Sequence, residues 1–159
     1  MKIIRVDSLA QRPLKAALMS DSSLRPDRRP LFLPDGQWSC EIRPAVRIDR
    51  LGKAVAARFA SKYYNSAALV NYLRPAGAED FRADMADDAI VIGKWVPVED
   101  LAEHFSFDKE GFDSLLEYLS ENTTFKTGDI IVLPDVIKSY APSINQEINV
   151  ENLLEFSIK

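Results

Sequence analysis

Short apolar runs, separated by breaks rich in proline, glycine and charged residues, recur along the whole chain. Runs of this length, with continuous or alternating apolar residues, are typical of β-strands rather than helices. The last run alternates most clearly, because polar residues separate Leu154, Phe156 and Ile158, which therefore face one side. We expect strands within the following segments: 1–8, 29–38, 39–49, 66–73, 89–97, 130–134 and 152–159.

Two segments instead have apolar residues at the spacing of an amphipathic helix. In 53–64 three of them recur at four-residue steps: Val55, Phe59 and Tyr63. In 113–122 three leucines share one helix face: Leu115, Leu116 and Leu119. We expect Asp113 to be the N-cap of this second helix, because a short acceptor side chain satisfies the first free backbone N–H groups. A further helical turn is expected within 79–88.

The predicted helices do not alternate regularly with the strands, which excludes a doubly wound parallel sheet. The pattern alone therefore predicts an α+β fold, predominantly β, with six or more strands and two short helices. Pro44 lies inside one predicted strand, and because proline has no N–H we expect an edge or a bulge there. A length of 159 residues, 47% of them hydrophobic, suits a single domain over 1–159 with its own core.

Charge and composition exclude some classes of partner. The net charge of -4 and the pI of about 5.1 argue against nucleic-acid binding. No apolar run approaches the roughly 20 residues needed to span a membrane, and the N-terminus is too charged for a signal peptide. We therefore expect no nucleic-acid partner and no membrane insertion.

The chain has one cysteine, Cys40, and one histidine, His104. No intrachain disulfide can form, so a reducing cytoplasm is the expected compartment. A Cys/His zinc site lacks ligands, and a Ser-His-Asp triad has one candidate base at most. We expect His104 to be an exposed helix or turn residue.

Glu41 and Arg43 should project side by side, because residues two apart on a strand share a face. A second acid beside Glu41 would indicate a metal site, whereas an arginine indicates an ion pair. The acidic segment 79–88 could supply oxygen ligands to calcium or magnesium. It lacks the spacing and central glycine of an EF-hand, so we expect a solvated loop.

Four stretches carry local signatures in a fixed order: "PLFLPDGQWSCEIRPAVRIDRLGKAVAARFASKYYNSAALVNYL", "AIVIGKWVP", "FKTGDIIVLPD" and "SIN…NVENLLEFSIK". Together they resemble the fumarylacetoacetate hydrolase family, particularly its small bacterial members. The resemblance is clearest over 30–159. It implies a mixed β-sheet roll and a homodimer. It also implies carboxylates that bind magnesium or manganese, which chelates a 2-oxo or 2,4-dioxo acid and polarises it for C–C hydrolysis, decarboxylation or isomerisation.

Carried over residue by residue, the family's metal ligands are largely lost. Its Glu-x-Glu pair falls on Glu41 and Arg43, and its next acidic ligand falls on Asn71. Its catalytic lysine falls near Asp84, where Arg82 could partly substitute, and its loop aspartate falls on Asp87. An arginine cannot be deprotonated in a protein, so it repels a metal and can neutralise a neighbouring glutamate.

Other family elements are also missing. The N-terminal element that supplies a catalytic histidine has no counterpart in the first 21 residues, and His104 lies elsewhere. The family's glycine- and threonine-rich substrate loop is replaced by 133–142, and the excursion between Asp108 and Asp113 is shortened. Together these losses indicate a shortened, catalytically degenerate member in which Glu41, Arg43, Asn71, Arg82 and Asp87 form a vestigial site.

We therefore expect a non-catalytic, metal-free protein with a binding or structural role and no cofactor. Arg43 and Arg82 could hold a small carboxylate through bidentate hydrogen bonds. The alternative is a magnesium- or manganese-dependent hydrolase, decarboxylase or isomerase of 2-oxo or 2,4-dioxo acids, with Glu41, Asp87 and one acid of 79–88 as ligands. A third interpretation is an oligomeric binding domain whose resemblance to the family is architectural.

Overall fold

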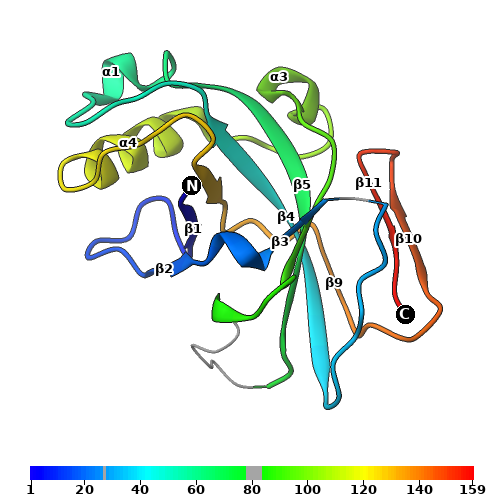
Figure 1. The fold of residues 1–159 in the computed structure, drawn as a ribbon. Helices are drawn as coiled ribbons and strands as arrows, with labels where there is room; N and C mark the ends of the chain where they lie inside the picture. Colours follow the sequence, from blue (N-terminus) through cyan, green and yellow to red (C-terminus); the bar gives the residue numbers. More distant parts are fainter. Residues whose placement is uncertain (27, 78–83) are drawn as a thin grey trace. The chain divides into compact units, whose positions relative to one another are not determined.

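The computed structural model describes residues 1–26, 28–77 and 84–159, and most of its regular structure is β (Figure 1). The strands are β1 (Ile3–Val6), β2 (Ala16–Met19), β3 (Leu24–Pro26), β4 (Trp38–Ile48), β5 (Tyr64–Pro75), β6 (Ile90–Ile92), β7 (Val96–Pro97), β8 (Ile130–Val132), β9 (Lys138–Tyr140), β10 (Glu147–Val150) and β11 (Leu154–Ser157). The helices are α1 (Ala57–Ala60), α3 (Val98–Leu101) and α4 (Lys109–Ser120), with a 3₁₀ turn, η1 (Asp21–Ser23). None of the described helices combines the length and apolar character needed to cross a membrane.

The chain divides by its contacts into two compact units, each made of three segments. The first unit contains Met1–Leu18, Ala45–Ala67 and Trp95–Pro134. The second unit contains Met19–Pro44, Ala68–Lys94 and Asp135–Lys159. The long strands β4 and β5 run through both units, so this division leaves the single domain over 1–159 a prediction.

In the first unit β1 pairs in parallel with β8, which pairs antiparallel with the second half of β4. β7 pairs with the start of β5, and α4 packs against α1. Buried apolar side chains of these elements and of the segment before β8 form the core of this unit. They include Ile3, Val46, Phe112, Leu115, Leu116, Phe125 and Ile131.

In the second unit the first half of β4 pairs antiparallel with β9, and the second half of β5 pairs antiparallel with β6. β3 extends this part of the sheet in parallel with β6, and β10 and β11 form an antiparallel hairpin (red and orange in Figure 1). Pro44 lies between the stretch of β4 that pairs with β9 and the stretch that pairs with β8. Its missing N–H therefore falls where the strand changes partner, and the expected edge or bulge stays a prediction.

Most of the predicted strands are confirmed. Leu154, Phe156 and Ile158 are all buried, as their alternation predicts. Two predictions need correction. The segment 89–97 forms two strands, β6 and β7, because the ladder with β5 is interrupted after Gly93, where the Lys94 N–H donates to Leu153 instead. The segment 29–38 contains no strand before Trp38, and Leu31 makes only an isolated bridge with Ile158.

The predicted helices are also corrected in extent. α4 begins earlier than expected: Asp108, not Asp113, is its N-cap and accepts a hydrogen bond from the Gly111 N–H. The helix predicted over 53–64 is reduced to the single turn of α1, and Phe59 is exposed. α3 was not predicted.

Gly93 permits a close approach between β6 and the β10–β11 hairpin. A Cβ atom at this position would lie 2.1 Å from the carbonyl oxygen of Leu153, and the Lys94 N–H donates to that same oxygen at 2.8 Å. Only glycine fits here without movement of the backbone. The hairpin is thus held against the end of β6 by a contact that any side chain would obstruct.

Candidate functional site

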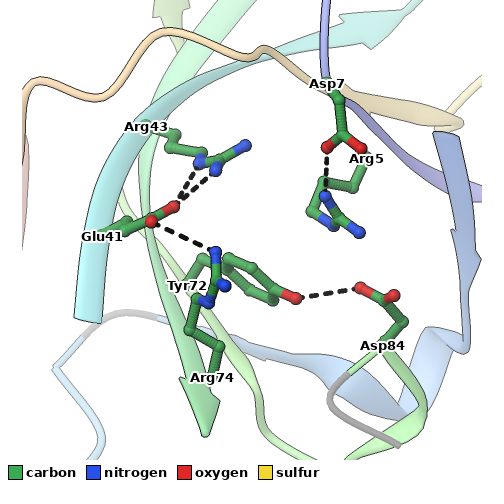
Figure 2. Close-up of polar contacts among 7 residues, drawn as sticks. All are labelled: Arg5, Asp7, Glu41, Arg43, Tyr72, Arg74 and Asp84. Atoms are coloured by element: carbon green, nitrogen blue, oxygen red, sulfur yellow. Dashed lines mark hydrogen bonds and ion pairs between the residues drawn. The ribbon is translucent and has the colours of Figure 1, made fainter. Parts of the chain in front are cut away.

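Glu41 and Arg43 form an ion pair on one face of β4. The Nε and Nη2 atoms of Arg43 donate hydrogen bonds to Oε2 of Glu41 at 2.8 and 2.5 Å (Figure 2). The strand places both side chains on the same face, because they are two residues apart. Of the two chemistries that this spacing allows, the geometry is that of a charge-assisted ion pair.

The other carboxylate oxygen of Glu41 faces a second arginine. Nη1 of Arg74, on β5, lies 3.4 Å from Oε1 of Glu41 (Figure 2). Both oxygens of Glu41 are therefore directed at guanidinium groups. The side chains are substantially removed from solvent, with exposed fractions of 15% for Glu41, 8% for Arg43 and 29% for Arg74. We call Glu41, Arg43 and Arg74 the arginine–glutamate cluster.

Tyr72 completes this face from β5. Its ring centroid lies 5.7 Å from Cζ of Arg43, within cation–π range. Its hydroxyl donates to Oδ1 of Asp84 at 2.9 Å (Figure 2). Tyr72 and Arg74 are two apart on β5 and share a face, which is a signal that the sequence contains. Finding them as neighbours of Glu41 requires the pairing of strands, so sequence reasoning missed them.

Asn71 does not join Glu41. Its Nδ2 atom donates to Sγ of Cys40 at 3.4 Å, and its Oδ1 accepts from the Tyr140 hydroxyl at 2.7 Å. Cys40 precedes Glu41 and Asn71 precedes Tyr72, so both point to the opposite face of their strands. The β5 residue that shares the face of Glu41 is Tyr72, one position beyond the one expected.

The buried Cys40 is unsuited to nucleophilic chemistry. Burial raises the pKa of its thiol, which disfavours the thiolate, although hydrogen bonds with Asn71 and Tyr140 act in the opposite direction. Burial also raises the pKa of Tyr140, with a smaller contribution from Cys40. These three side chains therefore form a neutral, packed network.

Asp87 and Arg82 are the remaining residues of the predicted vestigial site. Asp87 is exposed, and Arg82 lies outside the described residues. His104 is exposed in the turn after α3, as expected. Arg5 and Asp7, also drawn in Figure 2, form an ion pair of their own in the first unit.

A shallow hollow of about 370 Å³ in the second unit offers a weaker candidate. It is lined by Arg28, Glu147, Glu155, Phe156 and Ser157. Glu147 and Glu155 are exposed on the hairpin. Neither a histidine nor a cysteine lines it, and it shows no nucleophile paired with a base.

The described residues around Glu41 do not fit a divalent metal. Magnesium and manganese require several oxygen ligands with negative charge. Here one carboxylate is engaged by two guanidinium groups, and Asn71 offers its amide on the other face. Among the described residues, no three histidine, cysteine, aspartate or glutamate side chains lie close enough together to hold a metal.

No known protein-family profile matches the chain, and no curated protein matches it in sequence. Solved structures do match its fold. The chain is similar to 5-carboxymethyl-2-hydroxymuconate delta-isomerase from Mycobacterium smegmatis, with a TM-score of 0.76 and 17% identity over 99% of this chain and 78% of that one. It is equally similar to a structure described as a fumarylacetoacetate hydrolase family protein from Yersinia pestis CO92, with 17% identity, a TM-score of 0.76 and coverage of 99% and 92%.

A third similar structure is fumarylpyruvate hydrolase from Pseudomonas aeruginosa in complex with Mn2+ and pyruvate. Its TM-score is 0.72, with 14% identity over 99% of this chain and 89% of that one. These likenesses confirm the predicted fold, that of fumarylacetoacetate hydrolase family proteins. At such low identity they establish the fold alone, and the site must be judged from its own residues.

Proposed function

We propose that this chain is a metal-free, non-catalytic member of the fumarylacetoacetate hydrolase family that binds its ligand without transforming it. The observation that carries the proposal is the double engagement of Glu41 by Arg43 and Arg74. The fold supports the family, and the arginine–glutamate cluster supports the loss of metal-dependent chemistry.

The electrostatic balance at Glu41 supports the absence of a metal. At an effective dielectric constant of about 20, one carboxylate about 2 Å from a divalent ion attracts it by roughly 17 kcal/mol. Each guanidinium about 5 Å away repels the same ion by roughly 7 kcal/mol. Two guanidinium groups therefore cancel most of the attraction before the ion has lost any of its hydration shell. The cluster favours its own ion pairs over a bound metal.

Binding of Mg2+ and Mn2+ measured by isothermal titration calorimetry tests this proposal. We expect no saturable 1:1 binding of either ion, because Glu41 is already neutralised. Mg2+- or Mn2+-dependent turnover of oxaloacetate or an acylpyruvate is also expected to be absent. Tight stoichiometric metal binding, or turnover abolished by Glu41→Gln, would instead establish a metal-dependent enzyme with a rearranged site.

We extend the proposal to a cytoplasmic homodimer, as the resemblance to the family implies. The buried, unpaired Cys40 is compatible with a reducing compartment. Sedimentation velocity should give a species of twice the 17.9 kDa chain mass. A monomer at micromolar concentration would refute the dimer but would not bear on the proposal that the site is metal-free.

A further inference from the structure

One buried nitrogen of the arginine–glutamate cluster lacks a partner. Arg43 is buried, and two of its three guanidinium nitrogens bind Glu41. The third, Nη1, is buried and has no hydrogen-bond partner in the part of the chain that the structure describes. Figure 2 shows it pointing away from Glu41. A cationic donor is thus held in place with its N–H groups unused.

A buried donor without an acceptor is unfavourable, and native proteins rarely leave one unsatisfied. The positive charge makes an anionic oxygen a stronger acceptor than a neutral one. Arg43 is positioned in advance, because Glu41 fixes its Nε and Nη2 atoms and the ring of Tyr72 lies in cation–π range. A ligand carboxylate would therefore meet a donor whose conformational entropy has already been lost.

The charges of the arginine–glutamate cluster also favour an anion. Glu41 balances only one of the two guanidinium groups, and Arg74 makes a single long contact of 3.4 Å to it. Arg74 is also the most exposed member, so some of its donors remain accessible to a ligand. Asp84 places a second acid at the Tyr72 hydroxyl, so the four charges sum to zero and only the local field at the guanidinium groups favours an anion. These charges predict weak binding of small, singly charged anions.

We infer that the arginine–glutamate cluster binds small carboxylates through guanidinium N–H groups and gives no preference to a 2-oxo group. This inference rests on the proposed metal-free function. A metal ion selects 2-oxo acids because the oxo and carboxylate oxygens chelate it together. A guanidinium donor contacts the carboxylate alone, so the neighbouring oxo group adds little.

Propanoate and pyruvate, which differ by a 2-oxo group at equal chain length, are the matched probes. Titration of the intact protein, followed by the arginine side-chain NMR signals, should show both binding in the millimolar range. Their affinities should agree within about threefold and should not change when Mn2+ is added. Absence of saturable binding for both probes would overturn the inference while the metal-free function stands. Pyruvate binding that requires Mn2+ would overturn both.

Four substitutions identify the site by the sign of their effects. Glu41→Gln keeps an oxygen acceptor that can hold Arg43 but removes the competing negative charge, so it should tighten propanoate binding by about tenfold. Asp84→Asn should tighten it less, because Asp84 is bound at the far end of Tyr72. Arg74→Gln should weaken it by about fivefold. Arg58→Gln, the same charge change at an exposed position of α1, should leave it unchanged.

Circular dichroism melting should accompany each titration, so that a variant that fails to fold is recognised. If Glu41→Gln remains folded and weakens propanoate binding, Glu41 is not a competing charge and the inference is wrong. If that variant does not fold, Asp84→Asn and Arg74→Gln decide the question, because their expected effects have opposite signs.

Discussion

The contact at Gly93 and the charged face around Glu41 are governed by different forces. At Gly93 a backbone oxygen lies where a side chain would begin, so sterics decide which residue fits. Around Glu41 the side chains are substantially removed from solvent, and charge decides which chemistry the face supports. The first region specifies the fold, and the second specifies what the fold can bind. Under the proposed function, the charge of this face can change while the scaffold remains.

Gly93→Ala should produce the largest effect. The added Cβ would lie 2.1 Å from the Leu153 oxygen, which is backbone and cannot rotate away. We expect a loss of more than about 3 kcal/mol in the free energy of unfolding, measured by urea denaturation. Gly77→Ala is the control: its φ of +79° adds strain, but no atom lies within 4 Å. A cost of about 1 kcal/mol is expected there, and equal costs at both glycines would contradict a steric origin.

Arg43→Met should come second, because it leaves Glu41 substantially buried with only the distant contact from Arg74. We expect a loss of about 2–3 kcal/mol. A double-mutant cycle with Glu41→Gln isolates the pair, and the coupling energy should be about 2 kcal/mol. Coupling near zero would show that the two residues are merely neighbours.

Features set within one strand could be predicted from the sequence, whereas contacts between strands could not. The period of two on a strand correctly places Glu41 beside Arg43, and the alternation at Leu154, Phe156 and Ile158 correctly predicts β11. Arg74 could not be found this way, since its distance from Glu41 depends on which strands lie together. Asn71 shows how sensitive the prediction is to register: a shift of one residue transfers a side chain to the opposite face.

Helix limits were less predictable for a local reason. Asp108 and Asp113 can both cap a helix, and the apolar pattern of the leucines does not distinguish between them. In the structure Asp113 is buried inside α4 and accepts a hydrogen bond from the Tyr64 hydroxyl at 2.6 Å. That contact joins α4 to β5 and cannot be predicted from the sequence pattern, because it forms only when the helix packs against the strand.

Tyr64 and Tyr140 should make the free energy of unfolding depend on pH, with an effect of intermediate size. Burial raises the pKa of both hydroxyls, and at Tyr64 the hydrogen bond to Asp113 and the charge of Asp113 raise it further. Because the folded-state pKa lies above the unfolded value of about 10, this stability is complete below pH 10 and is lost as the pH rises further. We expect a loss of roughly 1.4 kcal/mol per pH unit for each tyrosine.

Urea denaturation between pH 9 and about 11 measures this slope. Tyr64→Phe should lower the stability by about 1 kcal/mol at neutral pH, because Asp113 loses a donor. It should also make the decline above pH 10 less steep. Tyr118→Phe, on the exposed side of α4, is the matched control. An identical slope in wild type and Tyr64→Phe would show that Tyr64 does not contribute.

Ala54→Gly should have the smallest effect on the free energy of unfolding. Its effect, like that of Gly93→Ala, has a steric cause. Ala54 has a φ of 51°, a left-handed conformation that disfavours residues with a Cβ. Relief of this strain outweighs the added flexibility of the unfolded chain, so we expect a gain of about 0.5 kcal/mol. Thermal melting monitored by circular dichroism would detect it as a higher midpoint. A lower midpoint would mean that the alanine is not strained.

Electron paramagnetic resonance of Mn2+ measures whether the positive charge of Arg43 keeps a metal from Glu41. The wild-type protein and Arg43→Glu are titrated side by side, with Arg43→Gln as the uncharged intermediate. We expect no saturable Mn2+ binding by the wild type and an affinity for Mn2+ that rises from Arg43→Gln to Arg43→Glu. Stoichiometric Mn2+ binding by the wild-type protein, undiminished relative to Arg43→Glu, would contradict this expectation.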